Sequence, residues 1–194
     1  MANKRTRALS REEFEKVIHI IKTGFLTSTG EKVRPNIKIA TALTLQGNIG
    51  LRIGDIVRFR LSDIVFESGR YRLDIVEEKT GKTRTFTVPT EVYIFLQKYA
   101  LENNIKPQGR LFNVTVRAVQ KHLQKVCDYL KLENISTHSF RKFFANEIYL
   151  KNDFNITLVK ELLQHSSLYS TTKYLSVDSK TVEKALQNHI VIPV

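Results

Sequence analysis

Apolar side chains recur at helical spacing through the N-terminal third of the chain, with glycines between the segments. Ser10 and Glu13 have the spacing of a capping box, so we expect a helix to begin at this serine. A loop over residues 23–35 would follow the first helix. The helical segments are expected over residues 10–22, from residue 37 to near Gly47 and Gly50, and over 51–61.

The pattern then changes from helical spacing to alternation. Three segments rich in β-branched and aromatic residues follow one another, and Gly69 and Gly81 lie in the breaks between them. Short segments of this composition separated by glycine-containing breaks are typical of hairpins. We therefore expect a three-stranded antiparallel sheet with two hairpins, its strands over 64–66, 71–76 and 83–88.

Helical spacing returns after the sheet. Thr90 is placed to cap a helix that runs to about Glu102, and apolar side chains at helical spacing mark another from Val114 to Leu130. Further helices are expected from just after His138 to about residue 151, and over 156–164, 170–174 and 179–188. The predicted fold class is mainly α, of the α+β type, with one small antiparallel sheet.

The length of 194 residues favours one domain with short appendages. Basic residues near the N-terminus predict a flexible arm over 1–9, followed by the domain over 10–188. The last six residues, 189–194, form an apolar tail that proline prevents from continuing the helix. Docking of this tail on a neighbouring protomer and packing against its own domain both remain open.

The charge balance favours a polyanionic partner. The chain has 31 Lys and Arg against 19 Asp and Glu, a net charge of +12. No stretch reaches the roughly 20 apolar residues of a membrane helix, and the N-terminus lacks the apolar core of a signal peptide. The single cysteine, Cys127, excludes an intramolecular disulfide and is expected in the core. We expect a cytoplasmic, nucleoid-associated protein without membrane contact.

Four short motifs carry residues suited to chemistry on a phosphodiester. Alone, each is weak, because an arginine beside a turn or a lysine in a hairpin is usually a solvated charge. In chain order the motifs are Gly-Leu-Arg-Ile-Gly-Asp around Arg52, Glu-Lys-Thr-Gly-Lys around Lys79, His-Ser-Phe-Arg with His138 and Arg141, and Leu-Leu-Gln-His ending at His165, nine residues before Tyr174.

Together, in this order, the motifs resemble those of the tyrosine recombinase (phage integrase) family over about residues 10–188. The resemblance implies a catalytic domain that cleaves and rejoins DNA through a 3′-phosphotyrosine, in integration, excision or inversion of a segment. It implies double-stranded DNA with inverted-repeat sites as partner, and self-association on that DNA as a dimer or tetramer. It implies neither a metal nor a cofactor, and a source in a bacterium, phage or mobile element.

The resemblance also implies a role for each candidate residue. Arg52 and Arg141 would bind the non-bridging phosphate oxygens, because guanidinium groups stay charged and bind two oxygens at once. Tyr174 would be the nucleophile, and its phenol, with a reference pKa of about 10, needs His138 as proton acceptor. Lys79 would protonate the leaving 5′-oxygen, while His165 would donate a hydrogen bond to the phosphate.

Two assignments have a competing residue, and one motif departs from the family pattern. Tyr169 competes with Tyr174, although its spacing from His165 does not match the family, and Lys82 competes with Lys79 on the same hairpin. Gln164 stands where the family usually has glycine, which changes the backbone freedom beside His165. Asp55 is expected to orient the arginine turn through hydrogen bonds, without a catalytic role. The remaining histidines, 19, 122 and 189, receive no role.

The helix over 114–130 has a polar stripe opposite its apolar one. In the family the corresponding helix approaches the major groove, so Thr115 and Arg117 could reach base edges and Lys121 could contact DNA. For Lys125 and Lys131 a solvated surface is an equally good interpretation. Two alternative functions stay open: a DNA-binding module of this fold that no longer recombines, and a relaxase similar to type IB topoisomerases.

Overall fold

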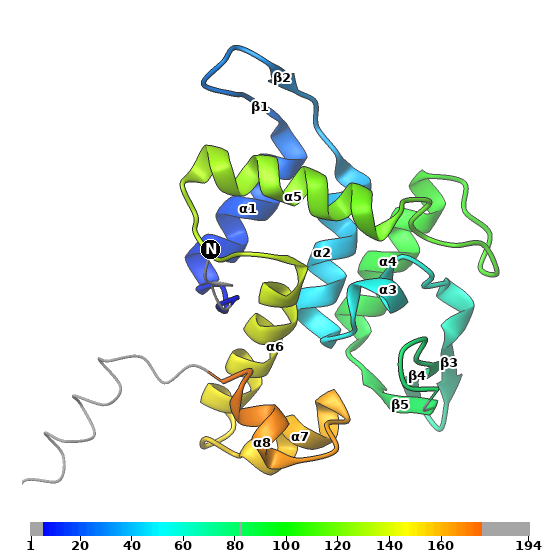
Figure 1. Ribbon diagram of the computed structural model, residues 1–194. Coiled ribbons are helices and arrows are strands. Elements are labelled where there is room, and N and C mark those ends of the chain that lie inside the picture. Colours follow the sequence, from blue (N-terminus) through cyan, green and yellow to red (C-terminus); the bar gives the residue numbers. More distant parts are fainter. Residues whose placement is uncertain (1–5, 82, 176–194) are drawn as a thin grey trace, which may run out of the picture.

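The computed structural model describes residues 6–81 and 83–175, and its main body is helical. Helix α2 (Ile37–Ile49) lies at the centre and packs against α1 (Arg11–Thr23), α6 (Thr137–Lys151) and the short α3 (Ile53–Ile56). Helix α5 (Val116–Leu130) packs against α1 and α6, and Figure 1 shows it running across α1. Cys127 on α5 is buried, as expected, and burial raises the pKa of its thiol to about 11.

Helix α1 begins as the capping box predicts. The Ser10 hydroxyl accepts a hydrogen bond from the Glu13 N–H at 3.1 Å, and the Glu13 carboxylate accepts one from the Ser10 N–H at 2.9 Å. The predicted end of α2 near Gly47 and Gly50 is confirmed, because Gly50 caps the helix, while Gly47 lies inside its last turn. Phe14 packs directly over Gly47, so the absence of a side chain there lets α1 approach α2.

The expected loop over 23–35 contains a small hairpin of strands β1 (Phe25–Leu26) and β2 (Lys32–Val33). Phe25 and Val33 face each other across it, and both are buried. The ring of Phe25 also lies 4.4 Å from that of Tyr129 on α5. These apolar contacts order a segment whose glycines and proline suggested only a loop.

The predicted three-stranded sheet is present and antiparallel, with strands in the order β3 (Ile64–Glu67), β4 (Arg70–Val76) and β5 (Thr83–Val88). The 3₁₀ turn η1 (Leu61–Asp63) leads into it, and α4 (Thr90–Glu102) packs against β4 and η1. Thr90 does not cap α4. Pro89 takes the capping position, and its carbonyl accepts the N–H groups of Val92 and Tyr93.

The C-terminal helices α7 (Ile156–Leu163) and α8 (Leu168–Thr172) lie at the end of α6 that points away from the β1–β2 hairpin (Figure 1). They pack through a second, smaller apolar cluster whose buried members are Phe144, Ala145, Val159 and Leu163. The helix expected over 179–188 and the tail over 189–194 lie outside the described residues. The fold class, mainly α with one small antiparallel sheet, is confirmed.

The expectation of a flexible arm over 1–9 is wrong for residues 6–9, while residues 1–5 lie outside the described part of the chain. Leu9 is buried in the main core, and the Arg7 guanidinium pairs with the Glu13 carboxylate at 2.6 Å. The Arg7 N–H also donates to the Asn134 carbonyl at 3.0 Å. In the described ranges, 6–81 and 83–175, no helix has the length and apolarity to cross a membrane.

Gly50, the residue that ends α2, allows a direct stability test. Its φ of +64° favours glycine, and an added Cβ would overlap the ring of Phe144. We expect Gly50→Ala to lower the free energy of unfolding by about 2–4 kcal/mol, from backbone strain plus overpacking. Gly69→Ala is the control, because its φ is +75° but the space around it is open, and it should cost about 1 kcal/mol. If urea unfolding shows equal losses of unfolding free energy for the two variants, the ring of Phe144 moves aside freely and the overpacking argument is wrong.

Candidate active site

The candidate site lies where three turns of the chain meet: the turn between α2 and α3, the turn between β4 and β5, and the segment that follows α7. They enclose a cavity of about 340 Å³. Its lining includes four side chains from these segments: Arg52, Thr80, His165 and Tyr174. Three of the six residues predicted to act on a phosphodiester thus line one cavity.

Arg141, on the first half of α6, is fully buried, and its guanidinium carbon lies 5.9 Å from the ring of Tyr174, which lines the cavity. Its guanidinium donates to the carbonyl of Gly50, and to that of Leu163 at 2.8 Å. Burial, together with the neighbouring charges of Arg84 and Arg52, lowers the pKa of Arg141 to about 10. The group therefore stays cationic at pH 7. The free-energy cost of burying this guanidinium is offset by its hydrogen bonds to two carbonyls, at the ends of α2 and α7.

Arg52 begins α3 and reaches the cavity with about a fifth of its side chain exposed. Its guanidinium pairs with the carboxylate of Glu77, which is almost fully buried. That carboxylate also accepts hydrogen bonds from Thr80 at 2.9 Å and from Arg84 at 3.1 Å. Burial alone would raise the pKa of Glu77, but these hydrogen bonds and charges outweigh it, so the pKa lies below its ordinary value.

Arg84 is a second buried arginine that sequence reasoning missed. Only 1% of its side chain is exposed, and it donates to the carbonyls of Ile49, at 3.3 Å, and Leu162. Strand alternation offers a signal for it, because Arg84 shares the inward face of β5 with Phe86 and Val88. An inward-pointing arginine needs a buried partner, and here this partner is Glu77.

His165 follows the left-handed residue that ends α7. Gln164 has φ 50° and ψ 42°, the conformation that glycine adopts most easily, and its side-chain amide donates to the Thr83 carbonyl at 3.0 Å. The departure from glycine is therefore accommodated with a contact to β5. The His165 Nδ1 lies 3.1 Å from the hydroxyl of Thr171. Burial and the charges of Arg141 and Arg52 lower the pKa of His165 to about 4, so the ring is neutral at pH 7.

Tyr174, and not Tyr169, is brought to the site. The half-buried ring of Tyr174 lies 4.7 Å from the His165 ring and 5.9 Å from the Arg141 guanidinium carbon. By contrast, Tyr169 is 71% exposed, and Lys173 lies over its ring at 4.2 Å. Of the two tyrosines, Tyr174 thus lines the cavity, and its role as nucleophile stays a prediction.

His138 and Lys79 lie nearer the surface. His138 stands at the start of α6, and partial burial of its ring lowers its pKa. The charges of Arg141, Lys79 and Lys142 lower the pKa of His138 further. Lys79 is exposed in the turn between β4 and β5. The rival Lys82 lies outside the described residues.

Asp55 connects α3 to the lysine-bearing turn. One carboxylate oxygen accepts the backbone N–H of Glu78 at 3.0 Å, and burial raises the pKa of the group. The side chain thus holds the hairpin turn, whereas the sequence led us to expect that it orients the arginine turn. Glu77, Arg84 and Thr171 were not anticipated. For Glu77 and Thr171 the local sequence carries no signal, since isolated acidic and hydroxyl side chains are common on surfaces.

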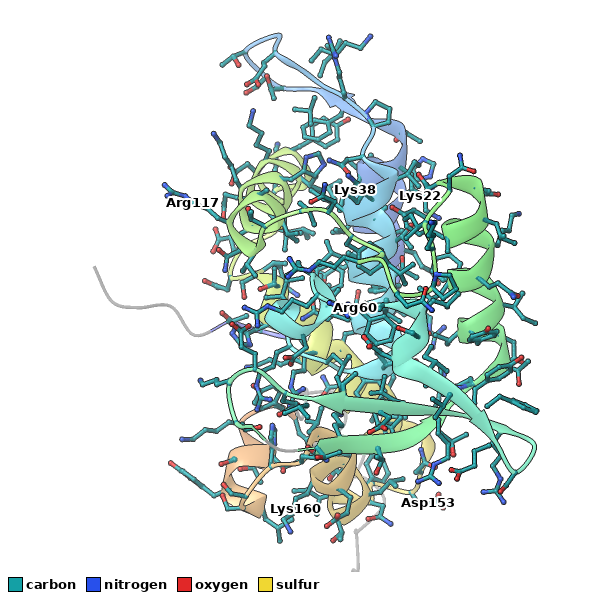
Figure 2. The ribbon with its side chains drawn as sticks, turned by 90° about the vertical axis from the view of Figure 1, so that its right-hand side faces the viewer. Lys22, Lys38, Arg60, Arg117, Asp153 and Lys160 are labelled. Carbon is teal, nitrogen blue, oxygen red and sulfur yellow. The ribbon has the colours of Figure 1, made fainter. Side chains whose placement is uncertain are left out.

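The residues expected to contact DNA lie on α5, away from the cavity. Thr115 caps this helix, and its hydroxyl accepts the Ala118 N–H at 3.2 Å. Arg117 and Lys121 are exposed, and Figure 2 shows the Arg117 side chain extending away from the body of the protein. The structure therefore leaves the two basic side chains accessible and gives the threonine a local structural role.

Solved structures of similar fold include recombinases bound to DNA. The post-cleavage complex of XerH with palindromic difH substrate matches 96% of this chain and 54% of that chain, with a TM-score of 0.72 at 22% identity. The catalytic domain of bacteriophage HP1 integrase matches 95% of this chain and 96% of that chain, with a TM-score of 0.64 at 19% identity. At these identities the likeness concerns the fold.

Sequence relatives are longer than the matched region. Tyrosine recombinase XerA of Pyrococcus furiosus is 27% identical over 192 residues, which cover 93% of this chain and 61% of the relative. A probable integrase/recombinase of Acholeplasma phage L2 is 30% identical over 151 residues, or 72% of this chain and 48% of the relative. This chain thus spans about half to three fifths of these relatives. The model of the phage integrase family matches residues 7–181, and the chain belongs to that family.

Proposed function

We propose that the protein is a site-specific tyrosine recombinase that cleaves and rejoins DNA through a 3′-phosphotyrosine. The observation that carries the proposal is the placement of the Tyr174 ring near both His165 and Arg141, in the lining of a cavity that Arg52 also lines. A phenol next to two guanidinium groups suits attack on an anionic phosphodiester, because cations stabilise the charge that develops on phosphorus-bound oxygens. The names of the relatives support the same activity.

In the proposed reaction the Tyr174 hydroxyl oxygen attacks phosphorus and the bond from phosphorus to the 5′-oxygen breaks. His138 accepts the phenolic proton, and Lys79 donates a proton to the departing 5′-oxygen. Arg52, Arg141 and His165 bind the non-bridging oxygens as negative charge increases there. Attack by another 5′-hydroxyl reverses the sequence and rejoins the strands, so the phosphotyrosine conserves the bond energy.

The partner in this proposal is double-stranded DNA with inverted-repeat sites, on which the protein associates as a dimer or tetramer. Arg117 and Lys121 contact the DNA from α5, together with Thr115 at its start. Their exposure on one helix supports this assignment, as does the net charge of +12. We assign the catalytic domain to residues 10–188, and the apolar tail over 189–194 to docking on a neighbouring protomer. We place the protein in the cytoplasm, associated with the nucleoid.

The nucleophile is tested by trapping the covalent intermediate on a nicked suicide half-site. Wild-type protein and Tyr169→Phe should both form a protein–DNA adduct that persists on a denaturing gel. Tyr174→Phe should form none, because it lacks the attacking oxygen while keeping the ring that packs on His165. An adduct with Tyr174→Phe would overturn the assignment. An adduct and relaxation of supercoiled DNA without strand exchange would favour a relaxase.

The general acid is tested with a substrate that carries sulfur at the bridging 5′ position. A thiolate leaves without a proton, so a missing acid matters little on this substrate. We expect Lys79→Ala to cleave ordinary DNA about 10² to 10⁴-fold more slowly than wild type, and to approach the wild-type rate on the sulfur substrate. Lys82→Ala is the matched variant. If Lys82→Ala alone shows this rescue, the acid is Lys82.

The proton acceptor is tested through the pH dependence of single-turnover cleavage. The pKa of His138 lies below its usual value of about 6.5, so its ring is neutral, and able to accept a proton, at pH 7. The cleavage rate should stay constant as pH falls from about 8 to 6.5 and decrease only at lower pH, where the ring becomes protonated. His138→Gln should be slower and should lose this decrease. A midpoint above pH 7 would contradict the assignment.

A further inference from the structure

A buried carboxylate lies directly behind the candidate site. The side chain of Glu77 is 1% exposed, and its two oxygens are divided between two arginines. One oxygen accepts from Arg84, while the other accepts from Arg52 and from the hydroxyl of Thr80. Glu77 thus binds the arginine that reaches the cavity and a residue of the turn that carries Lys79.

Arg84 binds the carboxylate oxygen of Glu77 that Arg52 does not use. Besides Glu77, it binds the carbonyls of Ile49 at the end of α2 and of Leu162 at the end of α7. These two carbonyls lie in the segments that lead to Arg52 and to His165. The buried pair of Glu77 and Arg84 therefore contacts the segments that carry Arg52, His165 and Lys79. These are three of the six candidate catalytic residues.

We propose that Glu77 and Arg84 are positioning residues, which fix the guanidinium of Arg52 and the Lys79 turn in the geometry needed for cleavage. The inference rests on the function proposed above, because it assigns a task to side chains behind that site. Neither residue would touch the DNA; both would act through Arg52 and the turn.

Charge and geometry explain why a carboxylate is needed at this place. An arginine side chain has several rotatable bonds, so an unpaired Arg52 would sample many positions in the cavity. The Glu77 carboxylate restricts these positions, and it is shared with the buried Arg84, so the three groups keep a net charge of +1. A phosphate entering the cavity still meets a cationic group. Misplacement of a positioned group by about 1 Å can reduce a rate by about 10²-fold.

The test compares Glu77→Gln with wild type in single-turnover cleavage of a suicide half-site. The amide keeps the size of the side chain but loses the charge that binds two guanidinium groups. We expect cleavage to fall by about 10²-fold while half-site affinity changes by less than about threefold. Glu78→Gln is the matched control, because Glu78 lies on the same turn in an exposed pair with Arg58, and it should cleave at the wild-type rate.

A substrate with a neutral methylphosphonate at the scissile position separates positioning from general loss of structure. Its transition state carries less negative charge, so cleavage depends less on Arg52. We expect the deficit of Glu77→Gln, relative to wild type, to shrink at least about tenfold on this substrate, as it should for Arg52→Ala. A deficit of equal size on both substrates would overturn the proposed role in fixing Arg52.

Loss of Glu77 leaves Arg84 buried without its counter-charge, which can destabilise the fold. The double variant Glu77→Gln/Arg84→Met removes both charges, and its melting temperature should exceed that of Glu77→Gln. Its cleavage should stay low, because Arg52 is still unrestrained. Recovery of wild-type cleavage together with the melting temperature would show that the pair serves folding alone, and would overturn the inference.

The same measurements distinguish this inference from the proposed function. If wild-type protein forms no adduct on either substrate, the proposed function fails and this inference fails with it. If wild type and Glu77→Gln cleave at equal rates, only the positioning role is overturned. The variant Glu77→Asp keeps the charge on a shorter side chain. A cleavage rate between that of wild type and that of Glu77→Gln would support the positioning role.

Discussion

Two buried arginines join the ends of α2 and α7, the two helices from which the chain enters the candidate site. Arg84 binds the carbonyls of Ile49 and Leu162, and Arg141 binds those of the next residue in each segment, Gly50 and Leu163. Carbonyls at helix ends lack partners within their own helix and carry partial negative charge. The guanidinium groups satisfy them, and α2 and α7 are joined at the point where the chain turns into the site.

This arrangement constrains the residues around it. Gly50 must adopt its positive φ so that the chain can leave α2, present its carbonyl to Arg141 and place Arg52 at the cavity. Gln164 adopts a similar conformation at the end of α7, and its contact with Thr83 ties the turn to the sheet. Both turns are left-handed, and the catalytic candidate follows within two residues in each case. The backbone conformation of these two turns thus sets the positions of Arg52 and His165.

Much of the fold and of the candidate site could be predicted from the sequence because the signals are local. Capping, helical spacing and alternation are properties of neighbouring residues, and they located α1, the three-stranded sheet and α5 to within about two residues. What depends on distant contacts was missed. The packing of Leu9 in the core and the contacts of Arg84 with the carbonyls of Ile49 and Leu162 involve residues far apart in the chain.

The separate apolar cluster under α7 and α8 has a consequence for the order in which the site can come apart. Four buried side chains hold these helices, whereas Arg52 and the sheet rest on the much larger main core. Local opening free energy depends on how much apolar surface an element buries, so the segment bearing His165 and Tyr174 is the less stable unit. The segment that carries Tyr174 can therefore open at a lower free-energy cost than the arginine turn, and its opening would also release the carbonyls of Leu162 and Leu163 from Arg84 and Arg141.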